Sequence, residues 1–210
     1  MFTLGRSILL AFLTFAGNVG ASSAEAAALQ IQIYDYANLE PQTLSEFLIW
    51  TERILVNTGM SVEVSLCRGS IAVSCENPTG TLDTLLVRVV GGDTKTPKHA
   101  NRLPLGQSFA SQHGGTHATI YLLPVQDQAA ATSLPWVILL AHAAAHEVGH
   151  LLLGTQAHTS RGLMKANWDR DDYLAMDHNQ CHFTPEQSRM LAKRYPPAAD
   201  HRSPECAPMP

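Results

Sequence analysis

The sequence reads WVILLAHAAAHEVGHLLLG from Trp136 to Gly154. This stretch contains the pattern H-E-x-x-H, formed by His146, Glu147 and His150, within an apolar run that is typical of a buried helix. Residues four apart share one helix face, so both imidazoles can reach one metal ion. Glu147 is displaced by about 100° around the axis, so it can reach a water on that ion without being a ligand. The pattern predicts a metal centre on a buried helix.

The residues after this helix offer a third ligand. Gly154 follows the last apolar residue, where a glycine favours a left-handed turn. Such a turn could bring His158 back to the metal. A few residues later, the run Gly162-Leu163-Met164 could form a tight turn that places Met164 beneath the site.

Two questions about the ligand set remain open. The rivals of His158 are the carboxylates of Asp169, Asp171 and Asp172. They lie about as far past His150 as the carboxylate ligand of other H-E-x-x-H zinc enzymes, although a solvated acidic loop has the same composition.

His142 lies four residues before His146, but each step of four drifts by about 40° around a helix. Three such residues cannot all converge on one ion, so we expect His142 to be a buried packing or supporting histidine.

The segment 141–168 resembles the motif block of the metzincin zinc proteases, H-E-x-x-H-x-x-G-x-x-H followed by a Met-turn. More narrowly, it is similar to small predicted secreted zinc proteases of bacteria. The resemblance implies one catalytic Zn²⁺, Glu147 as general base and Met164 as the Met-turn methionine. The zinc ligands that it implies are His146, His150 and His158.

The spacing departs from the metzincin pattern in one respect. Gly154 is the fourth residue after His150 instead of the third, and His158 is the fourth after Gly154. One extra helical residue rotates the exit direction by about 100°, so the connection 155–157 must compensate.

The pattern of the remaining chain favours an α+β fold with an α/β-like N-terminal part. Expected strands are 30–36, 61–66, 82–90 and 116–123, and expected helices are 41–57, 136–153 and 184–194. The strand–helix–strand order over 30–66 implies parallel strands. The stretch 91–115 is predicted to be a long loop, and the strand 116–123 to lead directly into the helix of His146. The C-terminal helix should start at Thr184 as N-cap and bury Met190 and Leu191.

The metzincin resemblance implies a twisted mixed sheet with a backing helix and an active-site helix, followed by a small, mainly helical C-terminal subdomain. It divides the domain into 27–154 and 155–210. It also implies that 118–122 is the edge strand of the cleft, where an extended peptide could add to the sheet.

The N-terminus has the features of a secretory signal, with Arg6, a short apolar run over 8–16, and small residues up to about position 26. We therefore expect a signal peptide over 1–26, a single catalytic domain over 27–210, and a secreted or periplasmic protein. In an oxidising compartment four cysteines favour two disulfides. Proximity in the sequence favours pairing Cys67 with Cys75 and Cys181 with Cys206, although a cysteine thiolate on zinc is a rival role for the last two.

The formal net charge of −4 suggests neither nucleic acid nor an anionic membrane as a partner. We expect a monomer that has no membrane contact after signal cleavage and that acts on a peptide or protein substrate. The leading hypothesis is a secreted zinc endopeptidase. The alternatives are a zinc exopeptidase, a non-catalytic zinc-containing binding module on the same fold, and a purely structural zinc site, which normally has four protein ligands.

Overall fold

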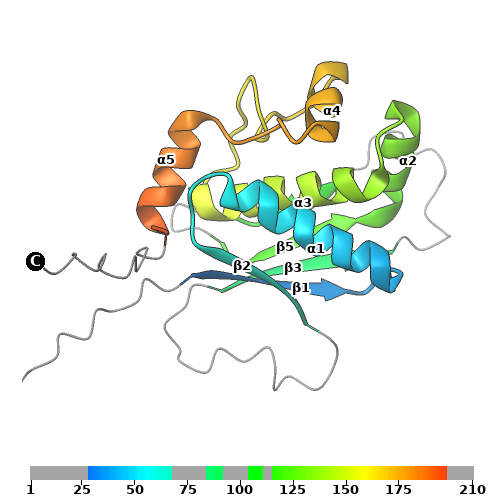
Figure 1. Ribbon diagram of the computed structural model, residues 1–210, viewed down its shortest axis with the longest axis horizontal. Coiled ribbons are helices and arrows are strands. Elements are labelled where there is room, and N and C mark those ends of the chain that lie inside the picture. The colour runs from blue at the N-terminus through cyan, green and yellow to red at the C-terminus, as the bar shows by residue number, and fades with distance from the viewer. Residues whose placement is uncertain (1–27, 68–83, 92–103, 111–114, 198–210) are drawn as a thin grey trace, which may run out of the picture.

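A five-stranded sheet carries the fold, and helices lie against one of its faces (Figure 1). The computed structural model describes residues 28–67, 84–91, 104–110 and 115–197. The strands are β1 (Leu29–Asp35), β2 (Val62–Cys67), β3 (Thr84–Val90), β4 (Gly106–Ser108) and β5 (His117–Tyr121). Their order is β2-β1-β3-β5-β4, and only β4 runs antiparallel to its neighbour. The mixed sheet and its helices form the α+β fold that the sequence predicts.

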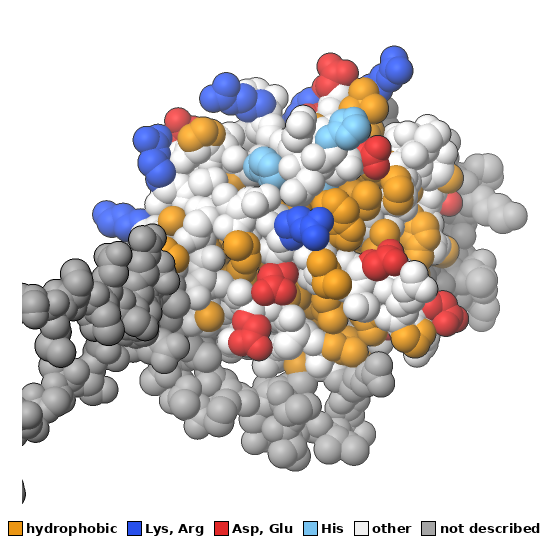
Figure 2. Space-filling view, viewed as in Figure 1, with side chains coloured by type: hydrophobic (Ala, Val, Ile, Leu, Met, Phe, Trp, Pro, Cys, Tyr) orange, Lys and Arg blue, Asp and Glu red, His pale blue; other side chains and the backbone are white. Residues whose placement is uncertain are grey.

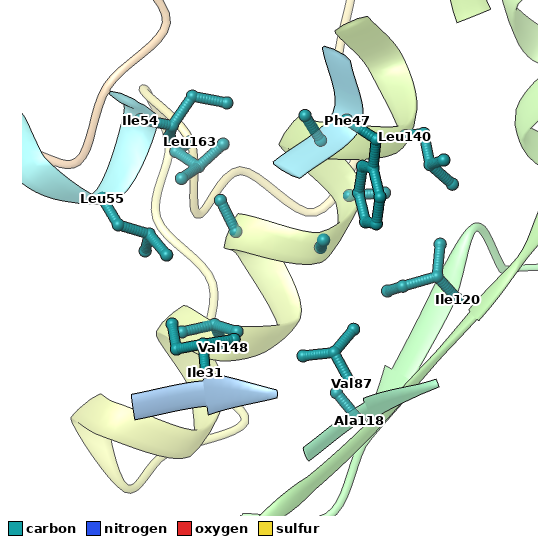
Figure 3. Packing of buried hydrophobic residues seen from close by; sticks show 14 of the residues in the cluster. Ile31, Phe47, Ile54, Leu55, Val87, Ala118, Ile120, Leu140, Val148 and Leu163 are labelled. Carbon is teal, nitrogen blue, oxygen red and sulfur yellow. The ribbon is translucent and has the colours of Figure 1, made fainter. Parts of the chain in front are cut away.

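Alternating side chains explain why one face of the sheet is buried. Ile31, Val87 and Ile120 are fully buried, and the residues next to each of them in its strand point to the opposite face. Figure 3 shows these three side chains gathered below the helix that carries Leu140 and Val148. The sheet therefore presents a continuous apolar surface on which the helices pack.

The helices are α1 (Pro41–Val56), α2 (Leu122–Thr132), α3 (Trp136–Leu153), α4 (Arg170–Asp177) and α5 (Pro185–Arg194). Helix α3 packs against the sheet and against every other helix, so it forms the centre of the core. By length and hydropathy it could span a bilayer, but every residue from Ile138 to Leu152 is buried within the fold. An apolar helix with no solvated face is what a core position requires.

The sheet edge beside α3 differs from the prediction. The segment expected to be the edge strand forms β5, which lies between β3 and β4. The edge is β4, from within the predicted long loop, and Gly106 to Ser108 pair with Ile120 to Ala118. A strand of three residues is too short to produce a recognisable alternation, and Gly106 weakened the pattern further.

Two further helices were missed. The chain does not pass directly from β5 into α3, because α2 begins at Leu122 and includes Pro124 in its first turn. Proline is tolerated there, since the first helical N–H groups have no partner within the helix. Helix α4 begins with a capping box between Asp169 and Asp172, a pattern that the sequence displayed.

The C-terminal helix α5 begins as predicted, with a capping box between Thr184 and Gln187 and Pro185 at its first position. Leu191 is buried, but Met190 is 60% exposed, so the prediction that it packs in the core is wrong. One residue corresponds to about 100° of helix rotation, which turns Met190 away from the core.

The cysteines agree only partly with the expected pairing. Cys67 is disulfide-bonded, but Cys75 lies outside the described residues, so that pairing stays a prediction. Cys181 is a free, buried thiol, which contradicts the proposed bond to Cys206. Cys206 and the expected signal peptide over 1–26 also lie outside the described residues.

The face of the molecule in Figure 2 carries acidic, basic and hydrophobic side chains, and many of the hydrophobic ones lie next to one another in the right half of the view. Ile49 and Val56 of α1 are each about half exposed. Partly exposed apolar side chains are common at the surface of a globular protein.

Candidate metal centre

His146 and His150 of α3 point their imidazoles at the same place. Their Nε2 atoms lie 3.1 Å apart, and the rings are nearly perpendicular. The α-helical spacing accounts for this arrangement, because residues four apart lie one turn above another. Both side chains are buried.

Backbone carbonyls fix which ring nitrogens are free. His146 Nδ1–H donates to the carbonyl of Leu163, and His150 Nδ1–H donates to that of Thr155, each at 2.8 Å. A carbonyl can only accept, so the Nδ1 atoms carry the hydrogens and the Nε2 atoms keep their lone pairs. Carbonyl acceptors behind metal-binding histidines orient the rings in the same way.

Burial keeps these imidazoles neutral. Desolvation lowers the pKa of His146 to about 4, and it also lowers the pKa of His150. Two uncharged Nε2 lone pairs therefore face each other at 3.1 Å, a contact that is repulsive unless a cation lies between them. Tetrahedral zinc with Zn–N bonds of about 2.0–2.1 Å would separate two ligand nitrogens by about 3.3 Å. The donor set thus fits a metal ion.

His158 completes the cluster from the loop after α3. The ligand atoms of His146, His150 and His158 all lie within 4.8 Å of one another. The His158 ring lies 5.3 Å from that of His146 and 4.9 Å from that of His150, measured between centroids. Unlike the other two, His158 is exposed to solvent. The third donor therefore lies on the open side of the site.

A left-handed turn at the end of α3 directs the following loop back toward the two histidines of the helix. Gly154 caps α3 with φ 65° and ψ 30°, and its N–H donates to the His150 carbonyl. The next residue, Thr155, provides the carbonyl that accepts from the His150 ring. The extra helical residue and the longer connection before His158 therefore compensate each other in the structure.

A second turn lies beneath the histidines. The Lys165 N–H donates to the Gly162 carbonyl, and Gly162 has a φ of 74°, which a glycine adopts without strain. Met164 is fully buried against α3 at Gly149, where a Cβ atom would come within 2.5 Å of the Met164 sulfur. The glycine inside H-E-x-x-H thus allows the Met164 side chain to approach the helix.

Trp168 is a neighbour of the site to which the sequence analysis gave no role. Its Nε1–H donates to the Leu163 carbonyl at 3.2 Å, the same oxygen that accepts from His146. The Trp168 ring also packs edge-on against the His146 ring at 5.5 Å. One carbonyl therefore links the loop to a helical histidine. A tryptophan four residues after the methionine was the only signal in the sequence.

Glu147 lies on α3 facing the short edge strand. Its Oε2 accepts a hydrogen bond of 2.6 Å from the hydroxyl of Ser108, and both side chains are buried. Burial raises the pKa of Glu147, whereas the Ser108 hydrogen bond and the neighbouring His158 lower it. Ser108 is a second neighbour that the sequence could not reveal, because it lies 39 residues away in a stretch without periodicity.

A cleft of about 920 Å³ opens over the histidines and Glu147. It is bounded by β4 on one side and by the loop after Met164 on the other. Besides the three histidines and Glu147, its lining includes Leu105, Gly106, Ser108, Gln128, Ala143, Gln156, Lys165, Asn167, Trp168 and Tyr173. The volume is within the range of sites that bind small molecules or segments of a chain.

The rival carboxylates serve other roles. Asp169 caps α4, and Lys165 forms ion pairs with Asp169 and Asp172. Asp171 is exposed in the first turn of α4. None of them belongs to the histidine cluster.

His142 is fully buried one turn before His146, and its Nδ1–H donates to the Ile138 carbonyl. Within the described part of the chain its Nε2 has no hydrogen-bond partner. The structure thus places His142 in the core and outside the cluster of three.

Comparison with known proteins adds information about the fold. No protein-family model matches the chain, and no curated protein matches it in sequence. Solved structures do match. The fold is similar to that of an archaemetzincin. The archaemetzincin comes from Methanopyrus kandleri and is 14% identical in sequence to this chain, with a TM-score of 0.52. The match covers 79% of this chain and 94% of the archaemetzincin.

A second similar structure is a zinc-dependent peptidase from Methanocorpusculum labreanum. It is 13% identical with a TM-score of 0.51, and the match covers 77% of this chain and 99% of the peptidase. At these identities the likeness to the archaemetzincin and to the peptidase concerns the fold.

Proposed function

We propose that the protein is a zinc-dependent peptidase. The observation that carries the proposal is the cluster of His146, His150 and His158 with Glu147 beside it in an open cleft. Three histidines with an open fourth position are typical of catalytic zinc, whereas structural zinc normally has four protein ligands. Both similar folds belong to proteins named for this chemistry, an archaemetzincin and a zinc-dependent peptidase.

The histidines and Glu147 have different roles in the proposed reaction. Zinc, when bound, supplies Lewis acidity that lowers the pKa of water and polarises a carbonyl group. His146 and His150, whose rings are oriented by the carbonyls of Leu163 and Thr155, would present neutral nitrogens to the metal, and His158 would supply the third from the loop. Glu147 accepts a proton from the attacking water and passes it to the leaving amine. Peptide bonds suit this site, because their cleavage needs both an activated water and a protonated leaving group.

Within this proposal, the peptidase is an endopeptidase of metzincin type. It binds one zinc ion and is exported through the N-terminal signal. Gly162, Leu163 and the buried Met164 support the metzincin type, since they form a turn beneath the histidines. The edge strand β4 borders the cleft, and an extended peptide would pair with its outer edge at positions other than the Ser108 carbonyl, which accepts from Gln156. A peptide that crosses the cleft needs no free terminus, which favours internal cleavage.

The test combines metal analysis with peptide cleavage by the purified mature chain. We expect about one zinc per chain and cleavage of internal bonds in peptides blocked at both ends. Glu147→Gln should keep the zinc and reduce kcat by about 10²- to 10⁴-fold, the usual contribution of a general base.

Other results would redirect the proposal. Cleavage of free-ended peptides alone would identify an exopeptidase. Stoichiometric zinc without cleavage of any peptide in a broad library would favour the non-catalytic binding module. No zinc in folded protein that had been supplied with the metal would overturn the proposal.

A further inference from the structure

The hydrogen bond between Ser108 and Glu147 joins the sheet edge to the centre of the site. Ser108 Oγ lies 2.6 Å from Glu147 Oε2. Ser108 is 6% exposed and Glu147 is 8% exposed, so water competes little for either group. Hydroxyl donors reach such short distances when the acceptor is a carboxylate, and these bonds are stronger than neutral ones.

The same strand contacts Glu147 at a second point. Gly106 lies two residues before Ser108, on the same face of β4. A Cβ atom on Gly106 would lie 2.7 Å from Glu147 Cγ and 2.9 Å from Ile120 Cδ1. The Glu147 side chain therefore lies directly against the bare backbone of Gly106. Packing at Cγ and the hydrogen bond at Oε2 together hold its side-chain conformation.

The strand itself is held on both sides. Ser108 pairs with Ala118 of β5, and the Tyr121 N–H donates to the Leu105 carbonyl at 2.9 Å. On its other side, the Ser108 carbonyl accepts from Gln156 Nε2 at 3.2 Å. Gln156 belongs to the loop that carries His158. Ser108 is thus connected to the sheet, to Glu147 and to the loop of the third histidine.

We propose that Ser108 is a positioning residue for Glu147, whose Oε2 it occupies so that Oε1 is the oxygen free to take up the proton of the attacking water. This inference rests on the proposed peptidase function. The Ser108 hydroxyl is directed at the carboxylate of Glu147, through which it acts. Its effect is to hold one orientation of the carboxylate before the substrate arrives, which avoids reorganisation during the reaction.

Steady-state kinetics on a blocked peptide substrate provide the first test. Ser108→Ala should lower kcat by about 10-fold or more, the effect of losing one hydrogen bond to a charged group. KM and zinc content should stay unchanged, because the hydroxyl is hydrogen-bonded to Glu147 and the candidate metal ligands are the three histidines. Ser108→Thr keeps the hydroxyl and should restore kcat to within about threefold of wild type.

A matched control is Thr119→Ala on the neighbouring strand β5. The Thr119 hydroxyl also takes part in a side-chain hydrogen bond, here as acceptor from Arg88 at 3.0 Å, but it lies on the face of the sheet away from α3. This variant should leave kcat unchanged. An unchanged kcat in Ser108→Ala, or a rise in KM alone, would overturn the proposal, as would equal losses in the alanine and threonine variants.

A double-mutant cycle on the zinc-free protein gives a readout that does not depend on activity. Ser108→Ala should lower the melting temperature in the wild-type background and have a clearly smaller effect in the Glu147→Ala background. Equal shifts in the two backgrounds would show that Ser108 and Glu147 do not interact and would overturn the proposal. If the wild-type enzyme cleaves no peptide, the peptidase proposal fails separately, and the cycle still decides whether Ser108 holds Glu147.

Discussion

Helix α3 and the loop that follows it build the same site by different means. Helix α3 places His146 and His150 through its own hydrogen-bond pattern, and both side chains are buried. The loop places His158 outside any helix or strand and leaves that side chain exposed. Local geometry therefore determines two donors of the site, whereas long-range contacts determine the third.

The loop is held by hydrogen bonds at several points. The Thr159 N–H donates to the Met164 carbonyl, and the Leu163 N–H donates to the His182 carbonyl. The Leu163 carbonyl in turn accepts from the ring of His146. Substitutions on the helix and substitutions in the loop should therefore differ in their effects on zinc affinity and on the free energy of unfolding.

The largest effect beyond loss of Glu147 is expected at His158. His158→Ala removes one of three nitrogens, so we expect zinc affinity to fall by more than about 100-fold, the upper end for loss of a merely supporting partner. Zinc competition with a chromophoric chelator measures it. His178→Ala removes an exposed histidine from the end of α4 and should have no effect. Undiminished affinity in His158→Ala would return attention to Asp169, Asp171 and Asp172.

Gly149 lies where the helix and the loop touch. A Cβ atom there would come within 2.5 Å of the Met164 sulfur and 2.7 Å of Phe183 Cε1. We expect Gly149→Val to lower the free energy of unfolding by up to about 3 kcal/mol through overpacking, as measured by urea denaturation. Gly91→Val is the control, because among the described residues its Cβ would meet only the Ala37 Cα at 3.8 Å. Equal stabilities of the two variants would show that Met164 is not packed tightly against α3.

His142 tests whether a helical histidine outside the cluster behaves as a core residue. Burial, with a smaller contribution from nearby His182, lowers its pKa to about 4 in the folded protein, although the hydrogen bond to the Ile138 carbonyl acts in the opposite direction. The unfolded chain, with a His pKa of about 6.5, therefore binds an extra proton between these two values. The free energy of unfolding that neutral His142 contributes at neutral pH is lost as the pH falls from about 6.5 toward 4. The loss reaches about 2 kcal/mol at pH 5.

The measurement is urea denaturation of the zinc-free protein at pH 7.5 and pH 5. His142→Leu should lose about 2 kcal/mol less than wild type between the two conditions, since one titrating histidine is gone. An identical pH dependence in His142→Leu and wild type would contradict a neutral, buried His142.

The smallest effect is expected at Trp168. Trp168→Phe keeps a ring beside His146 but removes one of two donors to the Leu163 carbonyl. We expect a loss of about 1 kcal/mol in the free energy of unfolding, the usual net value of one hydrogen bond, and less than a tenfold change in zinc affinity. A larger loss of zinc affinity than in His158→Ala would show that the loop is held mainly by Trp168.

The sequence predicted those elements that carry a strong local period. Helix α3 was predicted at the bounds that the structure has, and β1, α1, β2, β3 and α5 were found within a few residues. Prediction from the sequence failed where the local pattern was weak or mixed. The apolar run 118–125 covers the end of a strand and the start of a helix, and only Pro124 marked the change.

At the site, the sequence by itself determined the two donors and the glutamate on α3, since helical spacing alone puts His146 and His150 on one face. Only the tertiary structure decided that His158 and none of the aspartates joins them, and that Ser108 contacts Glu147. The physical reason is the range of the interactions. A helix repeats by hydrogen bonds between residues four apart, whereas the loop and the edge strand take their positions from partners far away in the chain.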